Sequence, residues 1–144
     1  MLFEEVIVRL RDQVPDLRSV QGAAEFQQLV DNRVQPQHGV AAYVLPLGLR
    51  GQQPMDAAGG FIQPVTEAVG VVLMLNSNDA LGQRAIQRLK PLLTEIIEAV
   101  ASWAPPTGAL GVFQLMRAQL VNVSGGFLTY QIDFSIPTRL RIDP

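Results

Sequence analysis

The sequence predicts a single α+β domain, in which a mixed or antiparallel sheet of about four strands is flanked by helices in the order α-α-β-β-α-β-β. Three observations lead to this prediction. The chain has 144 residues, the size of one domain with its own core. Apolar residues recur at helical spacing in three segments. Four other segments are short and apolar or alternate, as strands do. One domain over residues 1–144 follows.

The first two helices are short and amphipathic. Apolar residues at i, i+3, i+4 and i+7 predict about three helical turns near the start of the chain, ended by Pro15. A second pattern predicts a helix from about Gly22 to Asp31, with Asn32 as its stop. Both helices are expected to cover a sheet. The apolar positions of the first are Phe3, Val6, Ile7 and Leu10.

The third helix is long. Residues 76–79, NSND, offer N-cap side chains for it, and Pro105, Pro106 and Gly108 end it. Pro91 lies inside the pattern and predicts a kink or a fresh helix start, because proline lacks a backbone donor. The apolar stripe comprises Leu89, Leu92, Leu93, Ile96, Ile97, Val100 and Trp103.

Val40–Leu47 and Val65–Leu75 are the first two predicted strands, and they are expected to pair as an antiparallel hairpin. Gly70 marks a bulge or a close backbone approach in the second of them. Between the two lies Pro46–Pro64, PLGLRGQQPMDAAGGFIQP, a long and mostly polar interruption. Its length exceeds the ~12–15 residues beyond which loops are usually functional or disordered.

The last two predicted strands form a second hairpin. Leu110–Val123 is followed by a Ser-Gly-Gly turn at 124–126 and by Phe127–Ile136. In the final strand apolar and polar residues alternate, which is typical of a sheet with one face in water.

Composition narrows the classes of function. The chain is 48% hydrophobic but only 17% charged, with a positive mean hydropathy, which indicates either a well-filled core or surface buried against partners. A net charge of −2, with no basic cluster denser than Arg84, Arg88 and Lys90, argues against a nucleic-acid groove. With no cysteine, no signal peptide and no apolar run of membrane length, we expect a soluble protein of a reducing compartment.

Residues suited to catalysis or cofactor binding are sparse. His38 is the sole histidine and lies in a Pro/Gln-rich loop, which favours a solvated side chain. Glu95 and Glu98 are expected on the solvent side of the long helix. The glycine pairs at 59–60 and 125–126 lack the context of a phosphate loop. Trp103, Met74 and Met116 are expected in the core. We therefore expect no enzyme, no metal and no cofactor.

Several segments taken in order resemble the tail terminator proteins of long-tailed bacteriophages, especially those of Mu-like phages. They are FEEVIVRLRDQVPDLRSVQGAAEF, AAYVLPL, VGVVLML, NDALGQRAIQRLKPLLTEIIEAVASWAPP, FQLMRAQLV and GFLTYQIDFS, which together cover nearly the whole chain. These are core and turn signatures, so the resemblance rests on their order and spacing.

The resemblance implies a structural virion protein with a mixed sheet flanked by helices. Members of the family form a homohexameric ring on the finished tail tube, stop its polymerisation and present the surface that joins the neck of the head. The implied partners are other copies of the chain, the tail tube protein and a neck or connector protein. The implied location is the top of the virion tail, after assembly in the host cytoplasm. DNA passing through the lumen would make no specific contact, and no membrane is involved.

The polar interruption is the predicted contact site. We expect Leu47–Ile62 to be an extended hairpin tip that becomes ordered against a neighbouring subunit or the tube, and the alternative is a disordered loop without a partner. Two other functions stay open, namely another neck or tail-completion protein and, more distantly, a domain that binds a small ligand or acts as an enzyme. The predicted contact residues are Leu49, Arg50, Gln52, Gln53, Met55 and Phe61.

Overall fold

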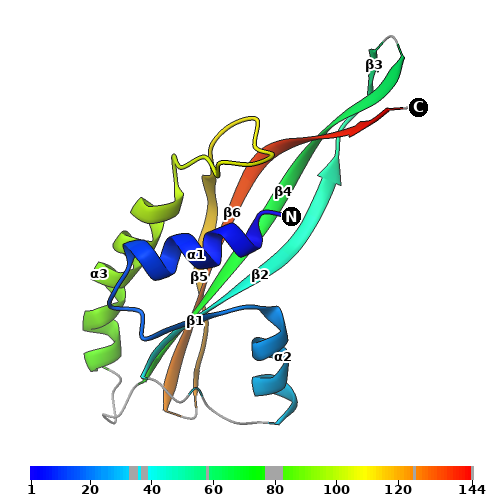
Figure 1. Ribbon diagram of the computed structural model, residues 1–144. Helices are drawn as coiled ribbons and strands as arrows, with labels where there is room; N and C mark the ends of the chain where they lie inside the picture. Colours follow the sequence, from blue (N-terminus) through cyan, green and yellow to red (C-terminus); the bar gives the residue numbers. More distant parts are fainter. Residues whose placement is uncertain (33–35, 37–38, 58, 77–82, 125, 144) are drawn as a thin grey trace.

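The computed structural model describes residues 1–32, 36, 39–57, 59–76, 83–124 and 126–143. These residues form three helices and six strands, in an order that confirms the predicted α-α-β-β-α-β-β once two three-residue strands are set aside (Figure 1). The elements are α1 (Phe3–Gln13), β1 (Ser19–Gln21), α2 (Ala23–Asp31), β2 (Val40–Gly51), β3 (Met55–Ala57), β4 (Gly60–Asn76), α3 (Gln83–Val100), β5 (Gln114–Ser124) and β6 (Phe127–Ile142).

The sheet is mixed, and its strand order is β1-β2-β4-β6-β5, with β3 paired to β4 outside this path. Only the β1–β2 pair is parallel among the described pairs, and β2, β4, β6 and β5 are antiparallel neighbours. The prediction of about four strands missed β1 and β3. Each has three residues, which is too short to show a two-residue period.

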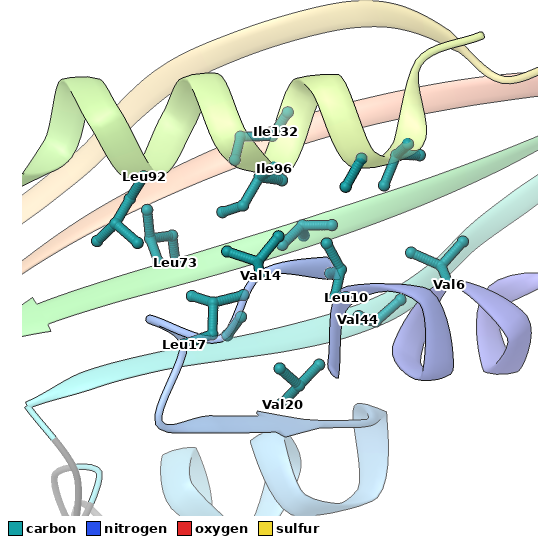
Figure 2. Packing of buried hydrophobic residues seen from close by; sticks show 14 of the residues in the cluster. Val6, Leu10, Val14, Leu17, Val20, Val44, Leu73, Leu92, Ile96 and Ile132 are labelled. Atoms are coloured by element: carbon teal, nitrogen blue, oxygen red, sulfur yellow. The ribbon is translucent and has the colours of Figure 1, made fainter. Parts of the chain in front are cut away.

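The helices lie on both faces of the sheet. Figure 1 shows α1 and α3 side by side across one face, while α2 packs over the other face near β2. Figure 2 shows how side chains of α1, α3 and the sheet point toward one another in the main core, with Leu10, Ile96 and Leu73 at its centre. A smaller cluster beneath α2 contains Tyr43, whose ring lies 5.3 Å from that of Phe26.

Local signals account for the helix limits. At the start of α2 the Gly22 backbone N–H donates to Glu25 Oε2 at 3.1 Å, closing the first turn. Helix α3 runs without interruption across Pro91, so a fresh start at that residue is not observed. It ends at Val100, earlier than the apolar stripe indicates, because the next turn contains Ser102 with φ of 69°. Three of its four predicted N-cap positions, 77–79, lie outside the described residues.

The largest difference from the prediction concerns Pro46–Pro64. The expected extended hairpin tip is present, but it consists of strands rather than a loop, because β2 continues to Gly51 and β4 begins at Gly60, with β3 between them. The last strand likewise runs six residues past its predicted end at Ile136, to Ile142, and pairs with β4 along this whole length. Together the residues 48–51, 55–57, 60–67 and 137–142 form a sheet extension, here called the β-arm, which projects beyond the helices (Figure 1).

Pro64 and Pro137 lie just outside the strands that the sequence predicted, so those strands were predicted too short. Whether a strand tolerates a proline depends on which neighbouring strand pairs with it at that position. Pro64 lies between the last β2–β4 pair, Gly51–Val65, and the first β3–β4 pair, Met55–Ile62. Pro137 lies just beyond the β5 ladder, where β6 is bridged through Thr138 to Ala109 and the Pro137 carbonyl accepts from the Leu110 N–H at 3.0 Å. Proline is tolerated at such positions because its missing N–H breaks no central ladder bond.

Candidate functional site

The β-arm has two chemically different faces. On the face that continues from the α1/α3 side of the sheet, register places Leu49, Phe61, Leu140 and Ile142, which are between 40% and 60% exposed. No described helix covers them, since α1 reaches only the base of the arm (Figure 1). The opposite face carries Arg50, Arg139 and Arg141, all exposed, and Arg141 forms an ion pair of 3.2 Å with Asp143. The arm is therefore an amphipathic sheet with an apolar side and a cationic side.

At the base of the arm a buried carboxylate meets the start of α1. Glu67 is 3% exposed, and its Oε1 accepts a hydrogen bond of 2.8 Å from the backbone N–H of Leu2. Leu2 is the N-cap of α1 and offers no side-chain cap. The glutamate therefore supplies from the sheet the acceptor that the helix start lacks. Beside it lies an open hollow of about 420 Å³, whose lining includes Met1, Leu49, Val65, Thr138 and Leu140.

A second hollow of about 560 Å³ lies across the α2 side of the sheet, where the arm begins. Its floor is a row of small side chains on neighbouring strands, because Gly48 pairs with Ala68 and Ala68 pairs with Ser135. Arg50, Gln52 and Met116 also line it. The hollow is a shallow groove rather than an enclosed site, and it holds one cationic group.

Strand β5 is the long edge of the sheet and is poorly covered. It spans 11 residues, and its partner on one side is β6. Bulges at Met116 and Val121 turn additional side chains outward. Its apolar residues are between 44% and 59% exposed, and they are Leu115, Met116, Leu120, Val121 and Val123. We call these five residues the β5 patch. It wraps around the edge of the sheet, because Leu115, Leu120 and Val123 pair with residues of β6 that face the main core, whereas Met116 lines the groove on the α2 side.

One ion pair lies behind this strand. Asp133 of β6 is 5% exposed and accepts hydrogen bonds from Arg117 Nη2 at 3.3 Å and from Gln131 Nε2 at 2.9 Å. Arg117, the charged residue of β5, is thus neutralised within its own chain. The edge strand therefore presents little net charge. The prediction that the α2-side residues of β6 face water fails at this aspartate.

All six predicted contact residues lie on the arm or its connecting turn, and all are exposed. The structure does not gather them on one face. Leu49 and Phe61 point to the apolar side of the arm, whereas Arg50 and Met55 point to the opposite side, which continues from the α2 face of the sheet. Gln52 lines the groove on the α2 side, and its side chain donates to Thr66 Oγ1 at 3.1 Å.

Sequence reasoning missed Leu140, Ile142, Glu67 and the β5 patch. It also placed Met116 in the core, which is wrong, because a bulge makes that side chain 59% exposed. The available signal was the consecutive pair Leu115-Met116, which breaks the alternation of a strand with one buried face. Met74 does pack beneath α2, and Trp103 packs against the main core, as expected.

Within the described ranges, no group of three or more His, Cys, Asp and Glu side chains could hold a metal ion. None of the described helices is long and apolar enough to cross a membrane. Of the two α3 carboxylates, Glu98 is exposed and Glu95 is half-buried. His38 lies outside the described residues. What these residues do present is two uncovered apolar surfaces on opposite parts of one small domain.

The family model for the phage tail terminator protein matches residues 1–144. The chain belongs to the phage tail terminator family. As a terminator-family protein it is a structural component of the virion, and its place is the tail.

A solved structure with a similar chain supports the fold. It is titled as the virion of a native gene transfer agent particle, and the match has a TM-score of 0.60 at 14% identity. The alignment covers 96% of this terminator-family chain and 95% of the other. No curated protein is significantly similar in sequence.

Proposed function

We propose that this protein forms a homohexameric ring on the finished tail tube, stops tube polymerisation and provides the surface that joins the tail to the neck of the head. The tail tube protein and a neck protein would be its partners. Family membership supports the role, and the two uncovered surfaces support the ring. The single observation that carries the proposal is that one chain has both a projecting arm with an uncovered apolar side and an uncovered edge strand, β5.

A ring that ends a tube needs distinct surfaces for distinct neighbours. Each subunit contacts two copies of itself, the tube below and the neck above, which raises the share of apolar surface a small domain has to expose. The low charged fraction of 17% fits this requirement. Termination needs one ring face that binds the tube end and an opposite face that does not bind the next tube subunit.

The test is polymerisation of purified tube protein with and without this protein. Tubes that bind it are expected to stop growing and to carry a ring at one end in electron micrographs. Tubes that lengthen equally in both samples would overturn the proposal. A ring bound to the portal-side connector but never to the tube would instead identify another neck or tail-completion protein.

An arm variant sharpens this test. Deleting residues 51–59 removes β3 and the tip while leaving the buried parts of β2 and β4 in place. The deleted protein is expected to fold and to lose ring formation or tube capping. The matched control is Val8→Ser on α1, which changes a side chain that is 64% exposed but lies away from the arm and β5. Normal tail length and normal head joining in the deletion would separate the arm from assembly.

A further inference from the structure

The structure leaves two apolar surfaces of one chain without a cover. The first is the apolar side of the arm, formed by Leu49, Phe61, Leu140 and Ile142. The second is the β5 patch, on the opposite edge of the sheet from β1. Each presents apolar area on the order of a few hundred Å², about the largest patch that a monomeric protein usually exposes. Two exposed apolar patches of this size on a chain of 144 residues indicate two contacts with other protein subunits.

We propose that the apolar side of the arm of one subunit lies against the β5 patch of the next copy, and that this head-to-tail contact builds the ring. The inference rests on the proposed function and specifies which surfaces of the chain meet. A second copy is the occupant that covers both surfaces at once, because each subunit gives an arm and receives one. A contact between two β5 patches would leave both arms uncovered.

Charge favours this pairing of surfaces. The β5 patch surrounds Arg117, whose charge is neutralised by Asp133. The apolar side of the arm is the side that avoids Arg50, Arg139 and Arg141, so that apolar surface meets near-neutral surface. The arginine-bearing side then stays turned away from the contact. Burying the Arg50 or Arg139 guanidinium in the contact would be costly, since a charge without a partner loses its hydration.

The shape of the edge strand indicates a contact through side chains. Edge strands are commonly protected from backbone pairing by bulges, and β5 has two of them, between Leu115 and Arg117 and between Leu120 and Asn122. These bulges interrupt any regular ladder with another chain while pushing Met116 and Val121 outward. A stable interface buries ~1,200–2,000 Å² in total, so the polar rims of both surfaces have to join the contact.

The contact joins two different surfaces, the arm and the β5 patch. Such a contact either repeats head to tail around a ring, as proposed, or occurs twice in a closed two-fold dimer, and covalent oligomers larger than a dimer distinguish the two. Along β6, Leu140 lies ten residues beyond Tyr130, which pairs with Leu120. At about 3.3 Å per residue, these positions are roughly 33 Å apart within one chain. A link between positions 140 and 120 therefore has to join two subunits.

The absence of cysteine from the chain makes this testable by site-directed cross-linking. The double variant Leu140→Cys/Leu120→Cys is treated with a short bismaleimide after assembly on tubes and in purified particles. The expected result is a ladder of covalent oligomers that ends at the ring. The matched control Val8→Cys/Leu120→Cys keeps one exposed apolar position away from the arm and is expected to give no ladder.

The outcomes separate this inference from the proposed function. Rings seen on capped tubes without the 140–120 ladder would overturn the contact and leave the capping role standing. A ladder on particles whose tubes are not capped would support the contact and overturn the capping role. Covalent dimers from Leu120→Cys alone would show that β5 of one subunit contacts β5 of another. Links from Leu140→Cys to the tube protein would show that the arm contacts the tube. Either result would overturn the proposed contact between the arm and the β5 patch. Unfolding midpoints equal to wild type confirm that the variants fold.

Discussion

The backbone N–H of Leu2 donates a 2.8 Å hydrogen bond to Glu67 Oε1, which joins the start of α1 to the base of the arm across 65 residues of sequence. The helix has no cap of its own at this end. A sheet carboxylate therefore accepts from the backbone N–H of the N-cap residue, as the glutamate of a capping box does, and joins the base of the arm to the helical layer.

Replacing Glu67 by leucine is expected to lower the free energy of unfolding by about 1–3 kcal/mol, because the Leu2 N–H would be left buried without an acceptor. Glu67→Gln keeps a carbonyl acceptor and should cost less. Urea denaturation measures both changes. Glu98→Gln, at an exposed position of α3, is the control and should stay within about 0.5 kcal/mol of wild type. Equal losses in the leucine and glutamine variants would contradict the capping role.

The effect of Gly70→Ala on stability is expected to depend on the side chain of Leu47. A Cβ added at Gly70 would lie 3.1 Å from the Leu47 Cδ atoms, so Gly70→Ala should cost up to about 1 kcal/mol by overpacking. In a Leu47→Ala background the same change should be neutral or stabilising, because alanine reduces the entropy of the unfolded chain. A double-mutant cycle with denaturant measures this coupling. The same effect of Gly70→Ala in both backgrounds would rule the contact out as its cause.

The single tryptophan reports on how α1 holds the end of α3. The Arg9 guanidinium lies 5.0 Å from the Trp103 ring centroid, and Arg9 Nε donates to the Ala99 carbonyl at 2.8 Å. Arg9→Gln is expected to cost about 1 kcal/mol and to shift tryptophan fluorescence, since both contacts involve this region. Arg84→Gln, on an exposed position, is the control. Unchanged fluorescence and stability in Arg9→Gln would show that the ring contact is unimportant.

Burial raises the pKa of the Tyr43 hydroxyl above its ordinary value of 10.0. Below this pH both folded and unfolded chains keep the proton, so stability is unaffected. Above it the unfolded chain releases the proton first, and stability falls as pH rises. Tyr43→Phe is therefore expected to lose less stability than wild type as the pH rises above 10.0. The measurement is urea denaturation at several alkaline pH values, and parallel slopes would refute the prediction.

The regular elements could be predicted because their signals are local. The spacing of Val6 and Leu10 puts both on one side of α1, and both are fully buried. The alternation through Ile132 and Phe134 likewise predicts which side of β6 meets the core. Such periodic patterns indicate which face of an element is buried, and they can be recognised without knowing which distant residues the element contacts.

The arm could not be predicted in this way, since it has no buried face to impose a period. Leu49 and Phe61 stand among Gly, Gln and Pro, and that composition is also typical of a loop. They become strands because Phe61 pairs with Ile142 across 81 positions of sequence, a partner that no local window contains. The same limit hid the two bulges of β5, which depend on its register with β6.

By itself, then, the sequence determined the three helices and the two hairpins, because the burial of one face produces a periodic pattern in neighbouring residues. Its core segments, taken in order, also indicated the tail terminator family. Only the tertiary structure decided that the hairpin tip at Pro46–Pro64 is made of paired strands, that Met116 faces outward and that Glu67 accepts a hydrogen bond from the start of α1. Those three features depend on which distant strands pair and in what register. A one-residue change of register would send each side chain to the other face of the sheet.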